Sequence, residues 1–429
     1  MRRRVIITGF GSITPIGHTA EETFAAALRG ECGVAAITRF DARGFPTKIA
    51  SEVKNFDLKN WLPNASDYSK AGENTKFALV AAKQALEDAS LFTASGIDRT
   101  RFGVYLGSGE GAEDFYSLID GVGRATDASG YRANSGQFCD AASRLFDPRR
   151  EAEFEMHTTA GHLAEEFDLC GPNFTCLTAC AASAQAIGEA TAFIRHDDAD
   201  IMLAGGAHSM IHPLGVTGFN RLTALSTRNA EPKRASRPFD LDRDGFVLGE
   251  GAGMVILEEL EHAKRRGARI YAELTGYGTT GDAYRMTDPH PEGRGAVLSM
   301  LDALKDARLA PDDIGYINAH GTSTAANDEC ETAAIKGAFR EKAYKIPVSS
   351  SKSMLGHLIA AGGAVELILS IQAMLRGVLP PTINYETPDP KCDLDYVPNV
   401  AREKPDVRNV LSNSFGFGGQ NITLIASRF

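Results

Sequence analysis

The chain has 429 residues, more than one hydrophobic core usually serves, so its length predicts two domains or a duplicated one. With 43% hydrophobic and 23% charged residues, the composition is that of an ordinary globular protein. The formal net charge of −10 argues against a nucleic acid or an anionic membrane surface as the partner.

The N-terminal segment has a charged start like that of a signal peptide, but Gly9 and Gly11 end its apolar run early. It is better predicted as a first strand. No run of eighteen apolar residues occurs, so no transmembrane helix is expected. The seven cysteines are scattered, unlike a disulfide framework, and we expect reduced thiols and a cytoplasmic protein.

Short apolar runs alternate with stretches of helical spacing, which predicts an α/β architecture. The expected strands are residues 5–8, 102–106, 173–177, 201–204, 253–257, 270–274, 314–317, 346–349 and 410–413. The expected helices are residues 75–91, 180–195, 295–307, 328–339 and 360–375.

One helix end is repeated within the chain. Residues 85–91 read Ala-Leu-Glu-Asp-Ala-Ser-Leu, and residues 303–309 read Ala-Leu-Lys-Asp-Ala-Arg-Leu. Each is followed by an acidic turn and a strand, which favours duplication over a chance match. We place the two halves at residues 1–260 and 261–429.

Two cysteines, Cys176 and Cys180, stand four apart and are followed mainly by small side chains. A zinc site would need a second Cys or His pair nearby, and none is present, so no metal is expected. Cys180 falls between a strand and a helix, where unpaired N–H groups stabilise a thiolate and lower its pKa. The small neighbours suit an inert buried thiol equally well, and this segment alone leaves both interpretations open.

Two histidines favour the catalytic interpretation. His320 follows one predicted strand, His357 lies beyond the next, and each stands beside a glycine. Sites in α/β proteins assemble at the carboxyl ends of strands. A lone histidine is usually structural, but two in such positions indicate a site.

Several motifs together resemble the β-ketoacyl carrier-protein synthases, and most closely the type II elongating synthases. They are Thr-Ala-Cys-Ala at 178–181, Asn-Ala-His-Gly-Thr-Ser-Thr at 318–324, Lys-Ser-Met-Leu-Gly-His at 352–357 and Asn-Ser-Phe-Gly-Phe-Gly-Gly at 413–419, with similar stretches at 237–249 and 392–398. The resemblance implies a thiolase fold, in which two βαβαβαββ halves form a five-layer α-β-α-β-α sandwich, and usually a homodimer.

The resemblance also implies a reaction, a decarboxylating Claisen condensation that needs no cofactor. Cys180 would accept an acyl group from an acyl carrier protein and then pass it to malonyl-acyl carrier protein, giving a 3-oxoacyl product. The N–H groups of Cys180 and Phe415 would form the oxyanion hole, while His320 and His357 would donate to the malonyl thioester oxygen.

Further residues match supporting positions of this family. Lys352 and Glu366 would support the histidines, and Thr322 and Thr324 would bind the phosphopantetheine arm. Thr324 would serve equally as the cap of the following helix. The glycine-rich segment after Phe415 lacks the Lys-Ser/Thr of a phosphate-binding loop and is expected to act as a gate for the acyl pocket.

Two other members of this superfamily fit less well. A thiolase would use a second catalytic cysteine, and a non-catalytic chain-length partner subunit lacks the nucleophile that Cys180 provides. A ketosynthase of type II polyketide-like synthesis remains an alternative to one of fatty acid synthesis.

Departures from the family concern the substrate and the partner. Glu110 stands where an apolar pocket residue is expected, and residues 121–157 include a long polar insertion. A buried carboxylate must be neutral, paired with Arg149 or Arg150, or directed at a polar acyl group, so we expect an unusual substrate range. Lys70 is near a carrier-protein docking position, but Thr223 replaces an arginine expected there.

Overall fold

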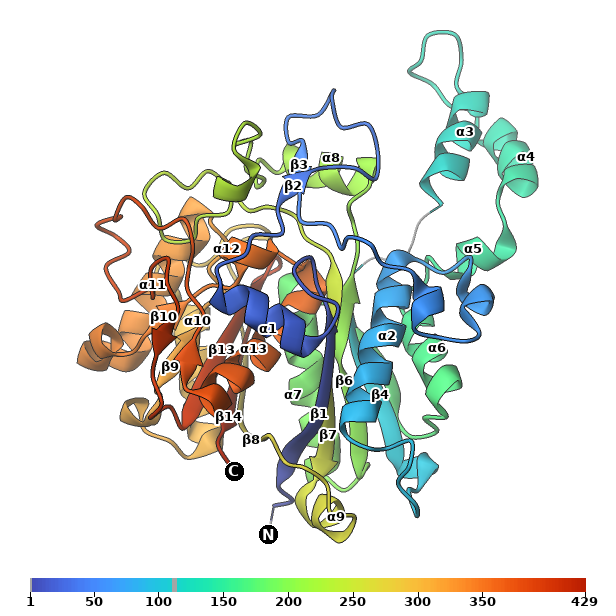
Figure 1. Cartoon of the computed structure of the whole chain (residues 1–429). Helices are drawn as coiled ribbons and strands as arrows, with labels where there is room; N and C mark the ends of the chain where they lie inside the picture. The colour runs from blue at the N-terminus through green and yellow to red at the C-terminus, as the bar shows by residue number, and fades with distance from the viewer. Residues whose placement is uncertain (1, 110–113) are drawn as a thin grey trace.

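A computed structural model describes residues 2–109 and 114–429 of the chain (Figure 1). Within these ranges, ten strands form one mixed sheet in the order β10-β9-β13-β14-β8-β1-β7-β6-β4-β5. Their bounds are β1 Val5–Ile13, β4 Phe102–Ser108, β5 Asn173–Cys176, β6 Ile201–His208, β7 Gly251–Glu259, β8 Ala272–Gly281, β9 Tyr316–Asn318, β10 Val348–Ser349, β13 Asn409–Gly416 and β14 Gln420–Ser427.

Two small antiparallel pairs and a set of helices complete the described fold. The pairs are β2 Ala35–Ala36 with β3 Ile49–Ala50, and β11 Val378–Leu379 with β12 Arg402–Glu403. The helices are α1 Ala20–Leu28, α2 Glu73–Asp88, α3 Phe115–Ala125, α4 Ser135–Leu145, α5 Pro148–Ala152, α6 Thr158–Phe167, α7 Ala182–Arg195, α8 Pro213–Arg221, α9 Leu260–Arg265, α10 Arg294–Ala307, α11 Ala325–Phe339, α12 Lys352–Leu355 and α13 Gly362–Arg376.

The strand order is symmetric about the β8–β1 pair. Outward from it, β7, β6, β4 and β5 on one side match β14, β13, β9 and β10 on the other, and each pair of neighbours has the same orientation on both sides. This is the duplication expected from the repeated helix end, and it agrees with the thiolase fold that the family resemblance implies. The domain boundary at residues 260 and 261 stays a prediction.

Helices α7 and α13 form the middle layer between the two halves of the sheet, and their small residues explain how they fit. A Cβ atom at Gly363 would lie only 2.8 Å from the Cβ atom of Ala184, so the two helices approach closely. A Cβ atom at Gly188 would meet the ring of Tyr277 at 2.3 Å. Helices α2 and α6 cover one outer face, and α10 and α11 cover the other (Figure 1).

The first strand is longer than predicted. Gly9 and Gly11 end the apolar run in the sequence, yet β1 continues through both to Ile13. A Cβ atom at Gly9 would lie 2.4 Å from the carbonyl oxygen of Ala85 in α2. These glycines therefore permit close packing of helix on strand, which an apolarity pattern alone does not reveal.

Within the described residues, one helical stretch, Ile359–Arg376, is long and apolar enough to cross a membrane. Of this window, 89% is buried inside the molecule. Its apolar character is therefore explained by its place as the middle-layer helix α13.

The polar insertion folds as helices. Figure 1 shows α3 and α4 standing away from the body of the molecule. They pack on each other closely, since a Cβ atom at Gly121 in α3 would lie 3.3 Å from the ring of Phe138 in α4. Asp147, which caps α5, forms an ion pair with Lys70, so the lysine predicted to dock a carrier protein is engaged by the insertion.

Candidate active site

Cys180 lies at the junction between β5 and α7, in a short 3₁₀ turn formed by Ala179–Ala181. Ala179 has a φ of 48°, in the left-handed region that residues other than glycine seldom adopt. Such backbone strain is found preferentially at functional sites. The turn places the buried thiol at the start of the middle-layer helix, as the sequence predicted.

The structure brings Cys180 together with both predicted histidines. His320 follows β9, His357 follows α12, and their ring centroids are 5.3 Å apart. The Cys180 sulfur and one nitrogen of each ring all lie within 4.8 Å of one another. Residues far apart in the sequence, one from the N-terminal half and two from the C-terminal half, thus form one buried cluster.

These three residues line a cavity of about 90 Å³, together with Thr322, Thr324 and Phe415. This volume is below the roughly 150 Å³ of an engineered cavity that binds benzene. An acyl chain of more than a few carbons therefore requires side chains around the cavity to move.

Both histidines are neutral. Burial, reinforced by the charge of Lys352, lowers the pKa of His320 and of His357 well below the usual value. The Nδ1 atom of His357 accepts the backbone N–H of Ile359 at 3.2 Å, so the neutral ring carries its proton on Nε2. Within the described residues this Nε2 and Nδ1 of His320 are buried without a hydrogen-bond partner.

The prediction of a lowered pKa for Cys180 is wrong. Burial raises the pKa of this thiol to about 11, although Lys352 and the N–H groups of Phe417 and Cys180 act in the opposite direction. Desolvation of a sulfur anion inside the molecule outweighs these favourable groups. The resting form of the site is a thiol beside two neutral imidazoles.

Lys352 and Glu366 form a buried ion pair beside the histidines. The lysine Nζ lies 2.5 Å from Oε1 of the glutamate, which is on α13. Burial raises the pKa of the Glu366 carboxyl, and Lys352 opposes that shift. The pair keeps the charged Lys352 side chain inside the site and connects α12 to α13.

Glu331 is a site residue that the sequence reasoning missed. Its carboxylate accepts the N–H groups of His320 at 2.8 Å and Gly321 at 2.7 Å, and it accepts from Asn413 at 3.2 Å. Burial raises its pKa to about 7. The available signal was the spacing of Asp328 and Glu331, three residues apart on the buried face of α11.

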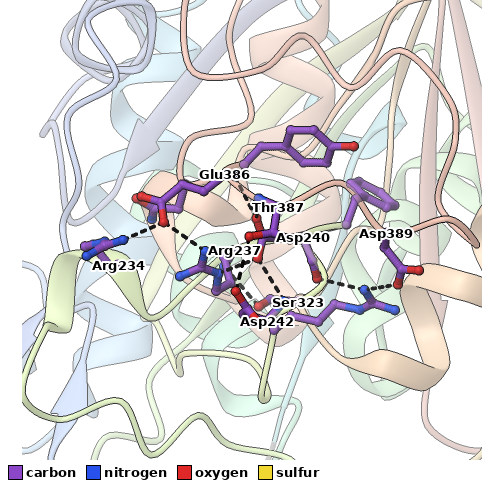
Figure 2. A network of polar contacts seen from close by, with 12 residues as sticks. Arg234, Arg237, Asp240, Asp242, Ser323, Glu386, Thr387 and Asp389 are labelled. Atoms are coloured by element: carbon purple, nitrogen blue, oxygen red, sulfur yellow. Dashed lines mark hydrogen bonds and ion pairs between the residues drawn. The ribbon is translucent and has the colours of Figure 1, made fainter.

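A polar network holds the loop that follows His320 in place (Figure 2). The side chain of Arg237 donates to Asp240 at 2.9 Å. The backbone N–H group of Arg237 donates to the hydroxyl of Ser323 at 3.0 Å. Asp240 also accepts the N–H groups of Glu386 and Thr387. The stretch that begins at Arg237 is therefore tied both to the His320 loop and to the later chain, which explains its place among the recognisable motifs.

The remaining predicted site residues also lie at the cavity. The hydroxyls of Thr322 and Thr324 are 2.9 Å apart, and Thr324 caps α11 by accepting from Asn327 at 3.3 Å, as predicted. The Phe415 ring lies 5.7 Å from that of His320. Its glycine-rich segment joins β13 to β14 rather than opening a helix. Glu110 lies outside the described residues.

Comparisons with known proteins identify the class to which this fold and site belong. The chain matches the family descriptions "Beta-ketoacyl synthase, N-terminal domain" at residues 2–263 and "Beta-ketoacyl synthase, C-terminal domain" at residues 271–386. The chain belongs to the beta-ketoacyl synthase family.

Individual proteins of known name or structure are also similar to the chain. The chain is 47% identical to 3-oxoacyl-[acyl-carrier-protein] synthase 2 of Coxiella burnetii, covering 100% of this chain and 99% of the relative. A beta-ketoacyl synthase from Burkholderia phymatum has a similar structure, with a TM-score of 0.88, 36% identity and full coverage of both chains. So does a type II polyketide ketosynthase solved in complex with its acyl-carrier protein, with a TM-score of 0.87, 36% identity and full coverage of both chains.

Proposed function

We propose that this protein condenses an acyl group held on Cys180 with malonyl-acyl carrier protein, releasing carbon dioxide and forming 3-oxoacyl-acyl carrier protein. The observation that carries the proposal is the convergence of the Cys180 sulfur with nitrogens of His320 and His357 within 4.8 Å. The names of the relatives support the same reaction.

The first half-reaction is acyl transfer to sulfur. The Cys180 thiolate attacks the thioester carbonyl of acyl-carrier protein, a tetrahedral oxyanion forms, and the carrier thiolate leaves and takes up the proton that Cys180 lost. The N–H groups of Cys180 and Phe417 are the proposed oxyanion donors, because these two act on the sulfur in the structure, in place of the Phe415 N–H expected from the sequence. The strained turn at Ala179 supports this role, because it holds Cys180 at the start of α7 facing the cavity.

The second half-reaction is decarboxylation and carbon–carbon bond formation. The malonyl carbon–carboxylate bond breaks, carbon dioxide departs, and its electron pair forms an enolate that attacks the Cys180 thioester and expels the thiolate. The developing oxyanion of malonyl thioester needs donors. The Nε2–H group of His357 and the neutral ring of His320 are suited to this because both face the cavity without another partner in the described chain.

Other residues have supporting roles in this proposal. Thr322 and Thr324 would bind the phosphopantetheine arm, Lys352 would help to keep both histidines neutral, and Glu366 would hold Lys352 in place. Phe415 would act as a gate, since the small cavity must enlarge to accept a chain.

We also propose that the protein is a homodimer that receives its substrates from an acidic acyl carrier protein. Strand β5 is one of the two outer edges of the sheet, and Phe174 in it and Leu177 just after it are 47% and 48% exposed. An open strand edge with exposed apolar side chains suits pairing with a second copy. All seven cysteines are free thiols, which supports a location in the reducing cytoplasm.

A type II polyketide-like ketosynthase is the second candidate function. The neighbour in complex with its acyl-carrier protein favours it, because its ketosynthase is described as bound to a hexaketide. The two candidates share their chemistry and differ in the chain that Cys180 carries.

The proposed function predicts a product that can be measured directly. The purified protein, given acyl-carrier protein and malonyl-carrier protein, should release carbon dioxide and form the 3-oxoacyl thioester in equal amounts, as followed by mass spectrometry of the carrier protein. Omission of the acyl donor is the control for uncoupled decarboxylation. Absence of the 3-oxoacyl product with every acyl donor would contradict the proposal.

Acylation should become faster as the pH rises. The thiolate is the nucleophile, and burial raises the pKa of Cys180 to about 11, so the reactive fraction should grow roughly tenfold per pH unit between about pH 6 and pH 9. The histidines stay neutral in this range because their pKa values are lowered. Single-turnover acylation, followed by intact-mass measurement, tests this expectation. A rate independent of pH would indicate a preformed thiolate instead.

A further inference from the structure

The last residue of β6, His208, is a buried histidine that none of the proposed steps uses. Its side chain is 2% exposed, and its Nε2 atom has no hydrogen-bond partner within the described residues. An unpaired polar group inside a protein destabilises the folded state, so such a group requires an explanation.

The direction of the His208 side chain follows from a neighbouring glycine. A Cβ atom at Gly206 would lie 2.6 Å from the Cβ atom of Ser183 in α7 and 2.5 Å from the carbonyl oxygen of Ala360. Side chains two residues apart on a strand share a face of the sheet. His208 therefore faces the middle layer, on the side of the sheet where α7 begins.

Contacts at the end of β4 define the position of the His208 ring more closely. A Cβ atom at Gly107 would contact the start of α7 at Ala182 and Ser183, and one at Gly109 would lie 2.4 Å from Nδ1 of His208. The imidazole thus lies against the backbone beyond β4, past the first residues of α7 and toward the Cys180 turn. It is also close enough to His357 to act on that residue's pKa.

The side chains around the Cys180 turn are mainly apolar. The buried cluster that contains Cys180 also contains Ile211, Val216 and Phe246, with Met210 packed against it. Burial, with a smaller contribution from His212, lowers the pKa of His208 to about 3, so its ring is neutral at physiological pH. A neutral imidazole with an unpaired nitrogen therefore lies close to His357, which lines the cavity at the sulfur that would carry the acyl chain.

We propose that His208 is a specificity-determining residue that hydrogen-bonds, through Nε2, an oxygen substituent on the acyl chain held by Cys180. This rests on the proposed condensing function and names its substrate class, acyl chains that carry a hydroxyl or carbonyl group. A site built to hydrogen-bond such a group discriminates against an analogue that lacks it, because the protein group is then left unpaired.

The experiment compares acyl-carrier proteins of equal chain length, either saturated or carrying one hydroxyl group at successive carbons. Its readout is kcat/KM for condensation with malonyl-carrier protein. Wild-type protein should prefer one hydroxylated position over the saturated chain by roughly tenfold or more. The His208→Leu variant should lose that preference while elongating the saturated chain at least as well as wild type.

Two further variants separate recognition from folding. His208→Asn keeps a short polar group and should retain part of the preference, whereas Met210→Leu alters the neighbouring apolar wall and should leave the preference intact. If His208→Leu does not fold, the Asn variant and wild-type protein carry the test, through the shift of the His208 ¹⁵N imidazole resonance on acylation. A hydroxylated chain should move the resonance more than a saturated chain does.

The outcomes distinguish this proposal from the proposed function. Elongation of saturated and hydroxylated chains with equal efficiency by wild-type protein would overturn the role of His208 and leave the condensing activity standing. An equal loss for both kinds of chain in a folded His208→Leu variant would make the residue structural. No product from any donor would instead count against the condensing function.

Discussion

Replacing Cys180 with alanine is expected to abolish acyl transfer and condensation while leaving the protein folded. The substitution removes the proposed nucleophile but only one buried sulfur atom, so the expected loss of stability is about 1 kcal/mol. Intact-mass measurement after incubation with acyl-carrier protein should detect an acyl adduct on wild-type protein and none on the variant.

A matched control is available four residues earlier in the chain. Cys176 is the last residue of β5, and burial raises its pKa to about 12, but it is not among the residues that line the cavity at Cys180. Cys176→Ala should keep the acyl adduct. An adduct on any cysteine other than Cys180 would contradict the assignment of the nucleophile.

His320→Ala and His357→Ala should each retain acylation of Cys180 but lose decarboxylation of malonyl-carrier protein. Both rings are proposed to donate to the oxyanion of the second half-reaction, and loss of one such donor costs roughly 10²–10³ in rate. Carbon dioxide release measures the effect, while the acyl adduct on Cys180 reports the first half-reaction separately.

The exposed His196, at the end of α7, provides the control substitution for this pair. His196→Ala should release carbon dioxide at the wild-type rate. If both active-site variants also did so, neither histidine would take part in the mechanism. Loss of acylation in either variant would move that histidine to the first half-reaction.

Sequence reasoning located the three central residues because their signals are local. Cys180, His320 and His357 each stand near the carboxyl end of a predicted strand, and the topology of an α/β protein brings such positions together. Their recognisable motifs then agree with the fold. The structure adds the distance at which the three side chains meet.

Features that depend on tertiary contacts could not be predicted from the sequence. The helix start beside Cys180 favours a low pKa, but the degree of burial, which reverses the shift, is set by segments distant in the chain. Glu331 was missed because its main partners are backbone N–H groups, so only its spacing from Asp328 on the buried face of α11 could have indicated it. The effect of Glu110 on substrate range stays a prediction.

The strained turn before α7 has a counterpart in the other half of the molecule. Ile359–Ala361 forms a 3₁₀ turn before α13, and Ile359 has a φ of 44°, close to the 48° of Ala179. Cys180 is the second residue of the first turn, and Ala360 is the second residue of the other. Duplication has therefore preserved a backbone shape at two places while its side chains diverged.

The two turns now perform different tasks. One presents a sulfur atom, and the other directs the N–H group of Ile359 at His357 and so selects the tautomer of that ring. The two turns therefore differ in their side chains and contacts, although their backbone shapes are alike. Because Cys180 lies in one half and both His320 and His357 in the other, neither half alone would contain the full set of proposed catalytic residues.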